Sequence, residues 1–206
     1  MEGEVYCNTS ETYRLEKFEA TGDVNEAGTA SEEQLIKILG AAPEAFLGVS
    51  NITSKPVNRW LHCWFALDYP ENDAELSLLT ADLIRAREQY GENFVLLPSN
   101  HLDEFLWRVR SLQPGAFVPG RVSYSTDQED WSLSCKPACF AYQREYRLMF
   151  GECSHKTTEP LVLRYHAGFA DLLEKNPQIK ILKNKSDAVW FKLNKDECFC
   201  CPDSHH

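Results

Sequence analysis

Hydrophobic and polar residues alternate most clearly between residues 139 and 151. Phe140, Tyr142, Tyr146, Leu148 and Phe150 alternate there with Gln143, Glu145, Arg147 and Met149. A period of two that is rich in aromatic residues and closed by glycine predicts a β-strand with one apolar and one polar face. The polar face of this strand would align an amide, a carboxylate and a guanidinium in one row.

Other segments carry equally simple patterns. The apolar run 60–67 predicts a central strand covered on both faces. Leucines at helical spacing predict a helix over 74–90, ended by Gly91, and another that starts at Ser99 or Asn100 and runs to Leu112. Shorter patterns predict strands within 4–20 and at 94–97, 121–125, 160–166, 179–182 and 188–193, helices at 31–40 and 168–175, and a loop at 114–120.

These elements follow one another without a strict strand–helix–strand rhythm. We therefore expect a single α+β domain over residues 1–195, with a mixed, largely antiparallel sheet and three to four helices. Beyond it, residues 196–206 are predicted to form a flexible tail rich in cysteine and histidine.

Composition narrows the class of partner. The formal net charge of -10 and the pI of about 5.1 argue against nucleic acid, because phosphate binding needs a basic surface. No apolar run approaches the roughly 18–20 residues that span a bilayer, so no membrane association is expected. The acidic start Met1-Glu2-Gly3-Glu4 is unlike a signal peptide. These features favour a cytoplasmic protein whose eight cysteines are mostly reduced and whose partner is a small molecule, such as a nucleotide, or another protein.

The predicted polar strand face is the main candidate site. A carboxylate on a rigid strand, Glu145, with Gln143 and Arg147 beside it, can stabilise a developing cation or act as a base. The alternative is a strand face held by ordinary cross-strand ion pairs, for which interactions below roughly 1 kcal/mol suffice.

The central part of the chain contains, in order, Tyr90-Gly91, the strand at Phe94, the helix at Leu102, Val122-Ser123-Tyr124 and the sequence from Phe140 to Arg147. In this order of motifs, residues 58–150 resemble a widespread bacterial domain of unknown function (DUF twenty-nine seventy-one). That family tends to end its core with an aromatic residue, an acid-x-acid pair and an arginine. Here Gln143 replaces the first acid, so the two-carboxylate pattern is incomplete.

The order Arg59, Ser125-Thr126, Gln143-x-Glu145 is similar to the motif of ADP-ribosyltransferases. This resemblance implies NAD as co-substrate, with Arg59 holding its phosphates and Ser125 bracing the site. It also implies that Glu145 stabilises the oxocarbenium ion while Gln143 orients the acceptor. The gap from Ser125 to Gln143 is shorter than that family usually shows.

The remaining reactive residues support simpler interpretations. His62 and Cys63 are adjacent on a predicted strand, point to opposite faces and are expected in the core. Cys198, Cys200 and Cys201 could contribute to a zinc site, but the adjacency of the last two is awkward for a tetrahedral geometry, and we expect no metal.

Two functional hypotheses remain: an NAD-type nucleotide-binding enzyme that uses Glu145, or a non-enzymatic protein-interaction or ligand-binding module. The enzyme hypothesis requires Arg59 and Glu145 to converge in one pocket, together with Ser125 and Arg147.

Overall fold

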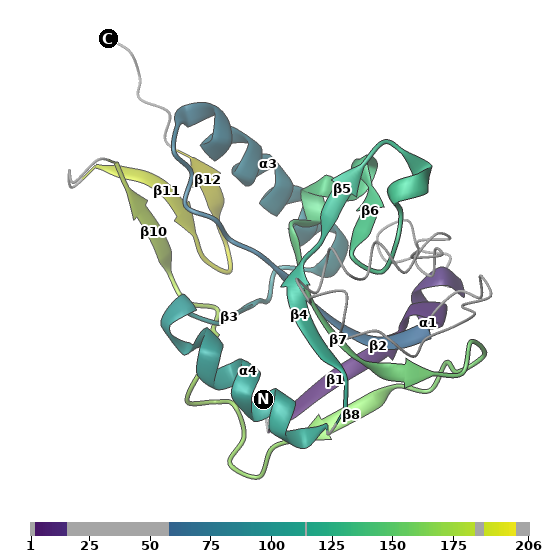
Figure 1. Ribbon diagram of the computed structural model, residues 1–206. Helices are drawn as coiled ribbons and strands as arrows, with labels where there is room; N and C mark the ends of the chain where they lie inside the picture. Colours follow the sequence, from purple (N-terminus) through teal and green to yellow (C-terminus); the bar gives the residue numbers. More distant parts are fainter. Residues whose placement is uncertain (1–2, 16–57, 114, 184–187, 201–206) are drawn as a thin grey trace, which may run out of the picture.

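A five-stranded sheet in the order β4-β7-β2-β1-β8, with every neighbouring pair antiparallel, is the main element of the computed structural model (Figure 1). The structure describes residues 3–15, 58–113, 115–183 and 188–200. The central strand of this sheet, β2, contains most of the apolar run 60–67, which predicted a strand covered on both faces. The strands of this sheet are β1 (Glu4–Thr9), β2 (Asn58–Phe65), β4 (Phe117–Arg121), β7 (Glu145–Cys153) and β8 (Leu161–Arg164).

Helices and smaller sheets surround the main sheet. The α-helices of the described residues are α1 (Ser10–Leu15), α3 (Asp73–Tyr90) and α4 (Leu102–Leu112). Short 3-10 helices are η2 (Ser99–His101), η3 (Gln128–Asp130) and η4 (Ala138–Gln143). The smaller sheets are β10-β11-β12 (Ile179–Leu182, Val189–Leu193, Cys198–Cys200), β3-β9 (Val95–Leu96, Glu174–Lys175) and β5-β6 (Ser123–Ser125, Cys135–Pro137).

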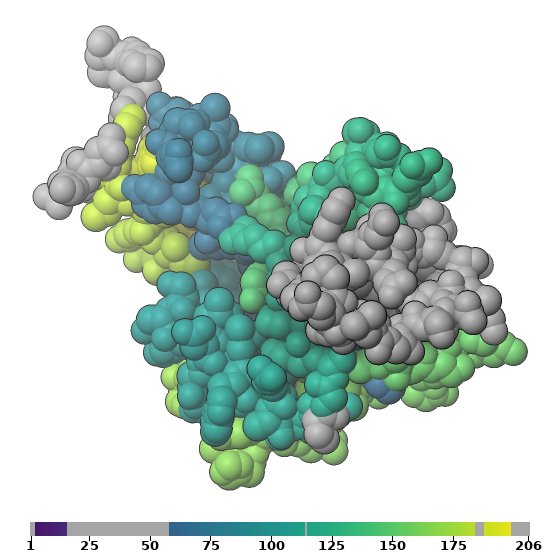
Figure 2. Space-filling view, in the orientation of Figure 1, coloured from purple at the N-terminus to yellow at the C-terminus, as the bar shows by residue number. Residues whose placement is uncertain are grey.

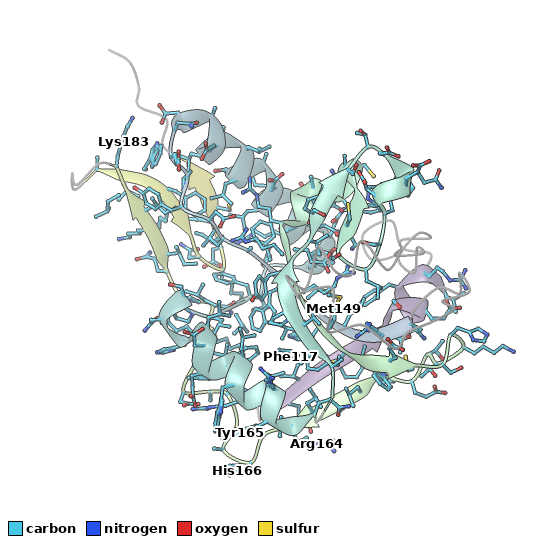
Figure 3. The ribbon with its side chains drawn as sticks, viewed as in Figure 1. Phe117, Met149, Arg164, Tyr165, His166 and Lys183 are labelled. Atoms are coloured by element: carbon cyan, nitrogen blue, oxygen red, sulfur yellow. The ribbon has the colours of Figure 1, made fainter. Side chains whose placement is uncertain are left out.

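One face of the main sheet carries the larger hydrophobic core. Phe150 on β7 is fully buried there, and its ring lies 5.2 Å from that of Phe117 on β4. Figure 3 labels Phe117. Phe105 and Val109 bring α4 onto this face, and Arg108 of the same helix lies over the Tyr165 ring. The other buried members of this core are Val5, Cys7, Leu148, Leu163, Phe169 and Leu172.

Helix α3 forms a second core with the C-terminal sheet. Its buried leucines pack against Trp190 and Phe191 of β11, while the indole nitrogen of Trp190 donates to Asp73 Oδ1 at 2.7 Å. Leu67 and Phe94 also pack here. In Figure 2 the C-terminal sheet and α3 gather at one end of the visible face, and α4 lies below them.

The α+β class and the largely antiparallel sheet are confirmed. Among the described strands, the pairing of β5 with β6 is parallel and all others are antiparallel. The predicted helices over 74–90 and up to Leu112 are confirmed as α3 and α4. The 179–182 and 188–193 strands are confirmed as β10 and β11, which pair with each other. No helix of the described residues is both long and apolar enough to cross a membrane.

The predicted polar strand starts later than its pattern indicated. Residues Ala138–Gln143 form η4, so the prediction of Gln143 on the strand is wrong. Arg144 follows in the left-handed conformation (φ 42°) and donates to Asp82 Oδ2 at 2.7 Å, and β7 begins at Glu145. In η4, Tyr142 is buried while its two neighbours are more exposed, so burial alternates along this turn as it would along a strand.

Pairing and loop assignments also needed correction. The predicted loop 114–120 contains most of β4, and the strand predicted beside β7 is β8, which pairs with β1. Part of 4–20 is helical, as α1. No α-helix occurs at 168–175, where β9 lies instead. These positions depend on partners distant in the sequence, which a local period does not report.

The ends of the chain differ partly from prediction. Residues 196–206 were expected to be a flexible tail, but Cys198–Cys200 form β12, which pairs with β11. The helix predicted at 31–40 lies outside the described residues, as do residues 201–206.

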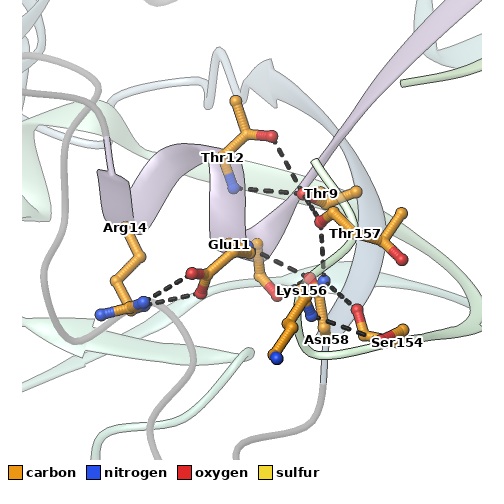
Figure 4. A network of polar contacts seen from close by, with 9 residues as sticks. Thr9, Glu11, Thr12, Arg14, Asn58, Ser154, Lys156 and Thr157 are labelled. Atoms are coloured by element: carbon orange, nitrogen blue, oxygen red, sulfur yellow. Dashed lines mark hydrogen bonds and ion pairs between the residues drawn. The ribbon is translucent and has the colours of Figure 1, made fainter. Parts of the chain in front are cut away.

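A buried asparagine connects three separate segments of the chain. Asn58 Oδ1 accepts hydrogen bonds from Ser10 Oγ at 2.8 Å and from the Glu11 amide at 3.1 Å (Figure 4). Its Nδ2 donates to the carbonyl oxygens of Ser154, at 2.8 Å, and Thr157, at 3.0 Å. These four bonds tie the start of α1 and the loop after β7 to the first residue of β2.

Candidate functional site

The face of the main sheet opposite the larger core holds a buried ion pair. Glu145 and Arg147 lie two residues apart on β7, so their side chains share this face. Both are almost fully buried, at 6% and 2% exposed. Arg147 Nε donates to Glu145 Oε1 at 2.8 Å, and Arg147 Nη1 donates to the Leu133 carbonyl at 2.6 Å. The polar face predicted from the sequence is therefore an interior surface.

Lys136 of β6 adds a second cation to this pair. Its Nζ lies 2.9 Å from Glu145 Oε2 and donates to Gln143 Oε1 at 3.1 Å. Lys136 is itself only 7% exposed. Two carboxylate oxygens are thus held by two different cations, one from β7 and one from β6.

The charge state of Glu145 follows from this arrangement. Burial by itself would raise the pKa of the Glu145 carboxyl, but the nearby Arg147 and Lys136 charges and hydrogen bonds from Arg147 and Cys63 lower the pKa to about 2. Glu145 is therefore ionised at neutral pH. Its negative charge is offset by two positive ones within ion-pair distance.

Backbone contacts fix the position of Glu145 at the start of β7. Its amide donates to the Tyr124 hydroxyl at 2.9 Å, and its carbonyl accepts from the Val122 amide at 2.9 Å. The Arg144 carbonyl accepts from the Ala66 amide at 2.8 Å, just beyond β2. The segment between β4 and β5 and the end of β2 therefore hold this residue from two sides.

A pocket of about 320 Å³ opens beside the ion pairs, and we call it the Glu145 pocket. In the pairing of β2 with β7, Cys63 lies opposite Arg147 and Phe65 lies opposite Glu145. Tyr90 at the end of α3 accepts a hydrogen bond from Gln143 Nε2 at 3.4 Å. The pocket is lined by Tyr13, His62, Cys63, Trp64, Phe65, Ala86, Tyr90, Lys136, Gln143, Glu145 and Arg147.

Burial shifts the pKa values of Tyr13, His62 and Tyr90 in the lining toward the neutral forms of these groups. Burial raises the pKa of Tyr90 to about 12 and raises that of Tyr13 further, so both phenols stay protonated. Burial also lowers the pKa of His62, whose Nδ1 lies 2.8 Å from the Tyr6 carbonyl oxygen. The ionic members of the lining at neutral pH thus include two cations and one carboxylate.

The structure brings together some of the sequence-predicted site residues. Gln143, Glu145 and Arg147 all line the Glu145 pocket. Arg59 does not line it; its Nη2 donates to Glu152 Oε1 at 2.7 Å near the other end of β2. Ser125 also lies outside the lining, where its hydroxyl donates to Asp130 Oδ2 at 2.7 Å. The condition that Arg59 and Glu145 share one pocket is not met.

Two important lining residues were missed from the sequence. Cys63 was predicted to be a core residue, but its side chain is exposed and lines the pocket. Lys136 lies in a segment that carries no strand or helix period. A signal for it does exist, because Lys136 is the only charged residue between Trp131 and Gln143. A single cation in a stretch of small and apolar residues is typical of a buried ion pair.

The described residues contain no group of three or more His, Cys, Asp or Glu side chains that could hold a metal ion. No protein-family profile, curated protein or solved structure matches this chain. The functional argument therefore depends on the pocket itself.

Proposed function

We propose that this protein binds a small anionic ligand of the nucleotide class in the Glu145 pocket. The observation that carries the proposal is the pairing of two buried cations, Lys136 and Arg147, with one carboxylate, Glu145. Among the described residues that line the pocket, Lys136 and Arg147 are positively charged and Glu145 is negatively charged, in a protein whose formal net charge is -10. A phosphate or carboxylate group that enters the pocket would meet two buried cations, and charge-assisted hydrogen bonds to such cations are stronger than neutral ones.

The shape and walls of the pocket support a ligand with a planar ring. Trp64, Phe65 and Tyr90 contribute aromatic surface, on which a base or pyridine ring can pack. Ligand pockets span about 300–1,000 Å³, so this pocket is at the small end of the range. That volume suits one mononucleotide-sized part of a ligand, and the rest of a dinucleotide such as NAD would extend outside.

The contacts of Glu145 favour binding over NAD cleavage. A carboxylate that stabilises an oxocarbenium ion must direct its charge at the ribose, whereas both Glu145 oxygens face cations of the protein. Arg59, expected to hold the NAD phosphates, is paired with Glu152. We therefore favour the ligand-binding module over the ADP-ribosyltransferase, with NAD kept as a candidate ligand.

Thermal unfolding with a matched set of ligands tests the proposal. We expect AMP, nicotinamide mononucleotide or NAD to raise the Tm, and uncharged adenosine to leave it unchanged. At a hundred times its Kd a ligand adds about 2.7 kcal/mol of stability, or about 5–10 °C in a chain of this size.

Variants show whether the pocket is responsible. Lys136→Met should abolish the shift, Lys136→Arg should retain it by keeping the charge, and Lys180→Met, at an exposed position on β10, should behave as wild type. The proposal fails if adenosine acts as well as AMP, if no anion raises the Tm, or if Lys136→Met leaves the shift intact.

A further inference from the structure

One of the five tryptophans has a buried indole nitrogen without a hydrogen bond. The indole nitrogens of Trp60, Trp131 and Trp190 each donate to an oxygen atom of the protein. Trp107 is 59% exposed, so its indole can donate to water. Trp64 Nε1, in contrast, is buried and has no partner among the described residues. A buried donor that stays unpaired costs free energy, so this nitrogen marks a place where a ligand can supply an acceptor.

His62 places an unused acceptor beside this donor. Its Nδ1 lies 2.8 Å from the Tyr6 carbonyl oxygen, which can only accept, so the ring carries a proton at Nδ1. Burial lowers the pKa of His62, and the neutral ring therefore has a lone pair at Nε2. No described residue donates to that lone pair. The rings of His62 and Trp64 meet edge to face, with centroids 5.5 Å apart.

These two side chains line a cavity of about 220 Å³ between β1 and β2, which we call the β1–β2 cavity. β1 pairs with β2 at Asn8 and Thr9, whereas its residues 4–7 pair with β8. His62 and Trp64 lie two residues apart on β2 and so share a face, where Trp64 packs against the larger core. Both residues also border the adjoining Glu145 pocket. The other described residues of the lining are mostly apolar: Gly3, Glu4, Val5, Cys63, Val95, Phe105, Phe169 and Leu173.

We propose that the β1–β2 cavity binds a small neutral carboxamide with an apolar body. An amide carries both groups that the cavity can pair: its carbonyl oxygen accepts from Trp64 Nε1, and its N–H donates to His62 Nε2. A carboxylate of the same shape has no donor for His62 and would bring a charge into a mostly apolar cavity, which is costly. Among the described lining residues Glu4 is charged, and Arg164 pairs with it at 2.5 Å. The site uses no cation and is therefore independent of the anion-binding function.

Two-dimensional ¹H–¹⁵N NMR of the ¹⁵N-labelled full-length protein tests the site, because each indole N–H gives its own signal. Trp64→Phe identifies the Trp64 signal by its loss. Cyclohexanecarboxamide is the probe. Cyclohexyl methyl ketone is the matched control, since it keeps the carbonyl and replaces the amide nitrogen by a methyl group of similar size. Cyclohexanecarboxylate is the charged control.

We expect the carboxamide to move the Trp64 indole signal in a saturable way and to leave the signals of Trp107 and Trp190 in place. The ketone should bind about three- to tenfold more weakly, which is the effect of one neutral hydrogen bond. The carboxylate should leave the Trp64 signal unmoved. His62→Phe should remove the preference for the amide over the ketone, a readout that a merely structural role of His62 would not change.

The same spectra show whether His62→Phe is folded, and if it is not, the comparison of amide and ketone on the wild-type protein decides. The inference is overturned if the carboxamide leaves the Trp64 signal unmoved, as it would if the unpaired groups serve only water. It is also overturned if the ketone or the carboxylate binds as tightly as the amide.

Discussion

Replacement of Glu145 by glutamine tests the central feature of the site, the carboxylate held by two buried cations. The variant keeps the size of the side chain and removes its charge, which leaves Arg147 and Lys136 with no carboxylate between them. Breaking a buried ion pair by removing one partner costs about 3–5 kcal/mol. The pKa gives a similar figure: a carboxyl whose pKa falls from 4.5 to about 2 on folding contributes about 3 kcal/mol at neutral pH.

The sign of this contribution fixes its pH dependence. The folded pKa of Glu145 lies below the unfolded one, so the stabilisation is fully present above about pH 4.5 and is lost as the pH falls toward about 2. Urea unfolding of wild type and Glu145→Gln at pH 7 and pH 3 measures both effects. We expect a loss of about 3 kcal/mol at pH 7 and a smaller difference between the two proteins at pH 3.

A matched control separates the buried pair from ordinary surface charge. Glu152 forms an ion pair with Arg59 at 2.7 Å, but its side chain is 68% exposed. Glu152→Gln should therefore cost less than about 1 kcal/mol at pH 7. Equal losses in the two variants, or a Glu145→Gln loss that does not shrink in acid, would refute the argument that burial makes the Glu145 pair important.

Two further substitutions test the parts of the fold that hold the site. Phe150→Ala in the larger core should lower the free energy of unfolding by about 3–5 kcal/mol, whereas Trp107→Ala, at a position 59% exposed, should change it by about 0.5 kcal/mol or less. Asn58→Ala should cost about 1–3 kcal/mol because it removes the hydrogen bonds of a buried side chain to the Ser154 carbonyl and the Glu11 amide, while Asn100→Ala, at an exposed position, should be close to neutral. Urea unfolding measures the free energy of unfolding of all four variants. Similar losses for Phe150→Ala and Trp107→Ala, or for Asn58→Ala and Asn100→Ala, would contradict the burial of Phe150 or of Asn58.

The local patterns of the sequence were enough to locate several elements that position the site. The apolar run 60–67 predicted β2 as a central strand, and the spacing of leucines predicted α3 and α4. The alternation after residue 144 predicted that Glu145 and Arg147 share one face of β7. Each of these conclusions depends on the backbone period of neighbouring residues, which is a local property. The fold class followed from the order of such elements.

Tertiary structure decided the character of the site. A period of two shows that Glu145 and Arg147 share a face, but it does not show whether that face meets water or protein. Lys136 and Leu133 contact this face from a segment whose sequence has no periodic pattern. For the same reason Cys63 was mistaken for a core residue.

Pairing between distant strands also lay beyond the sequence. Arg59 lies on the same strand as Cys63, yet its partner is Glu152, and this choice is set by the register of β2 against β7. Register and burial are long-range properties, since they depend on which segments the whole chain brings together. The sequence by itself therefore determined the class of fold and the pair Glu145 and Arg147, and only the folded chain determined that these residues, with Lys136 and Cys63, form a pocket.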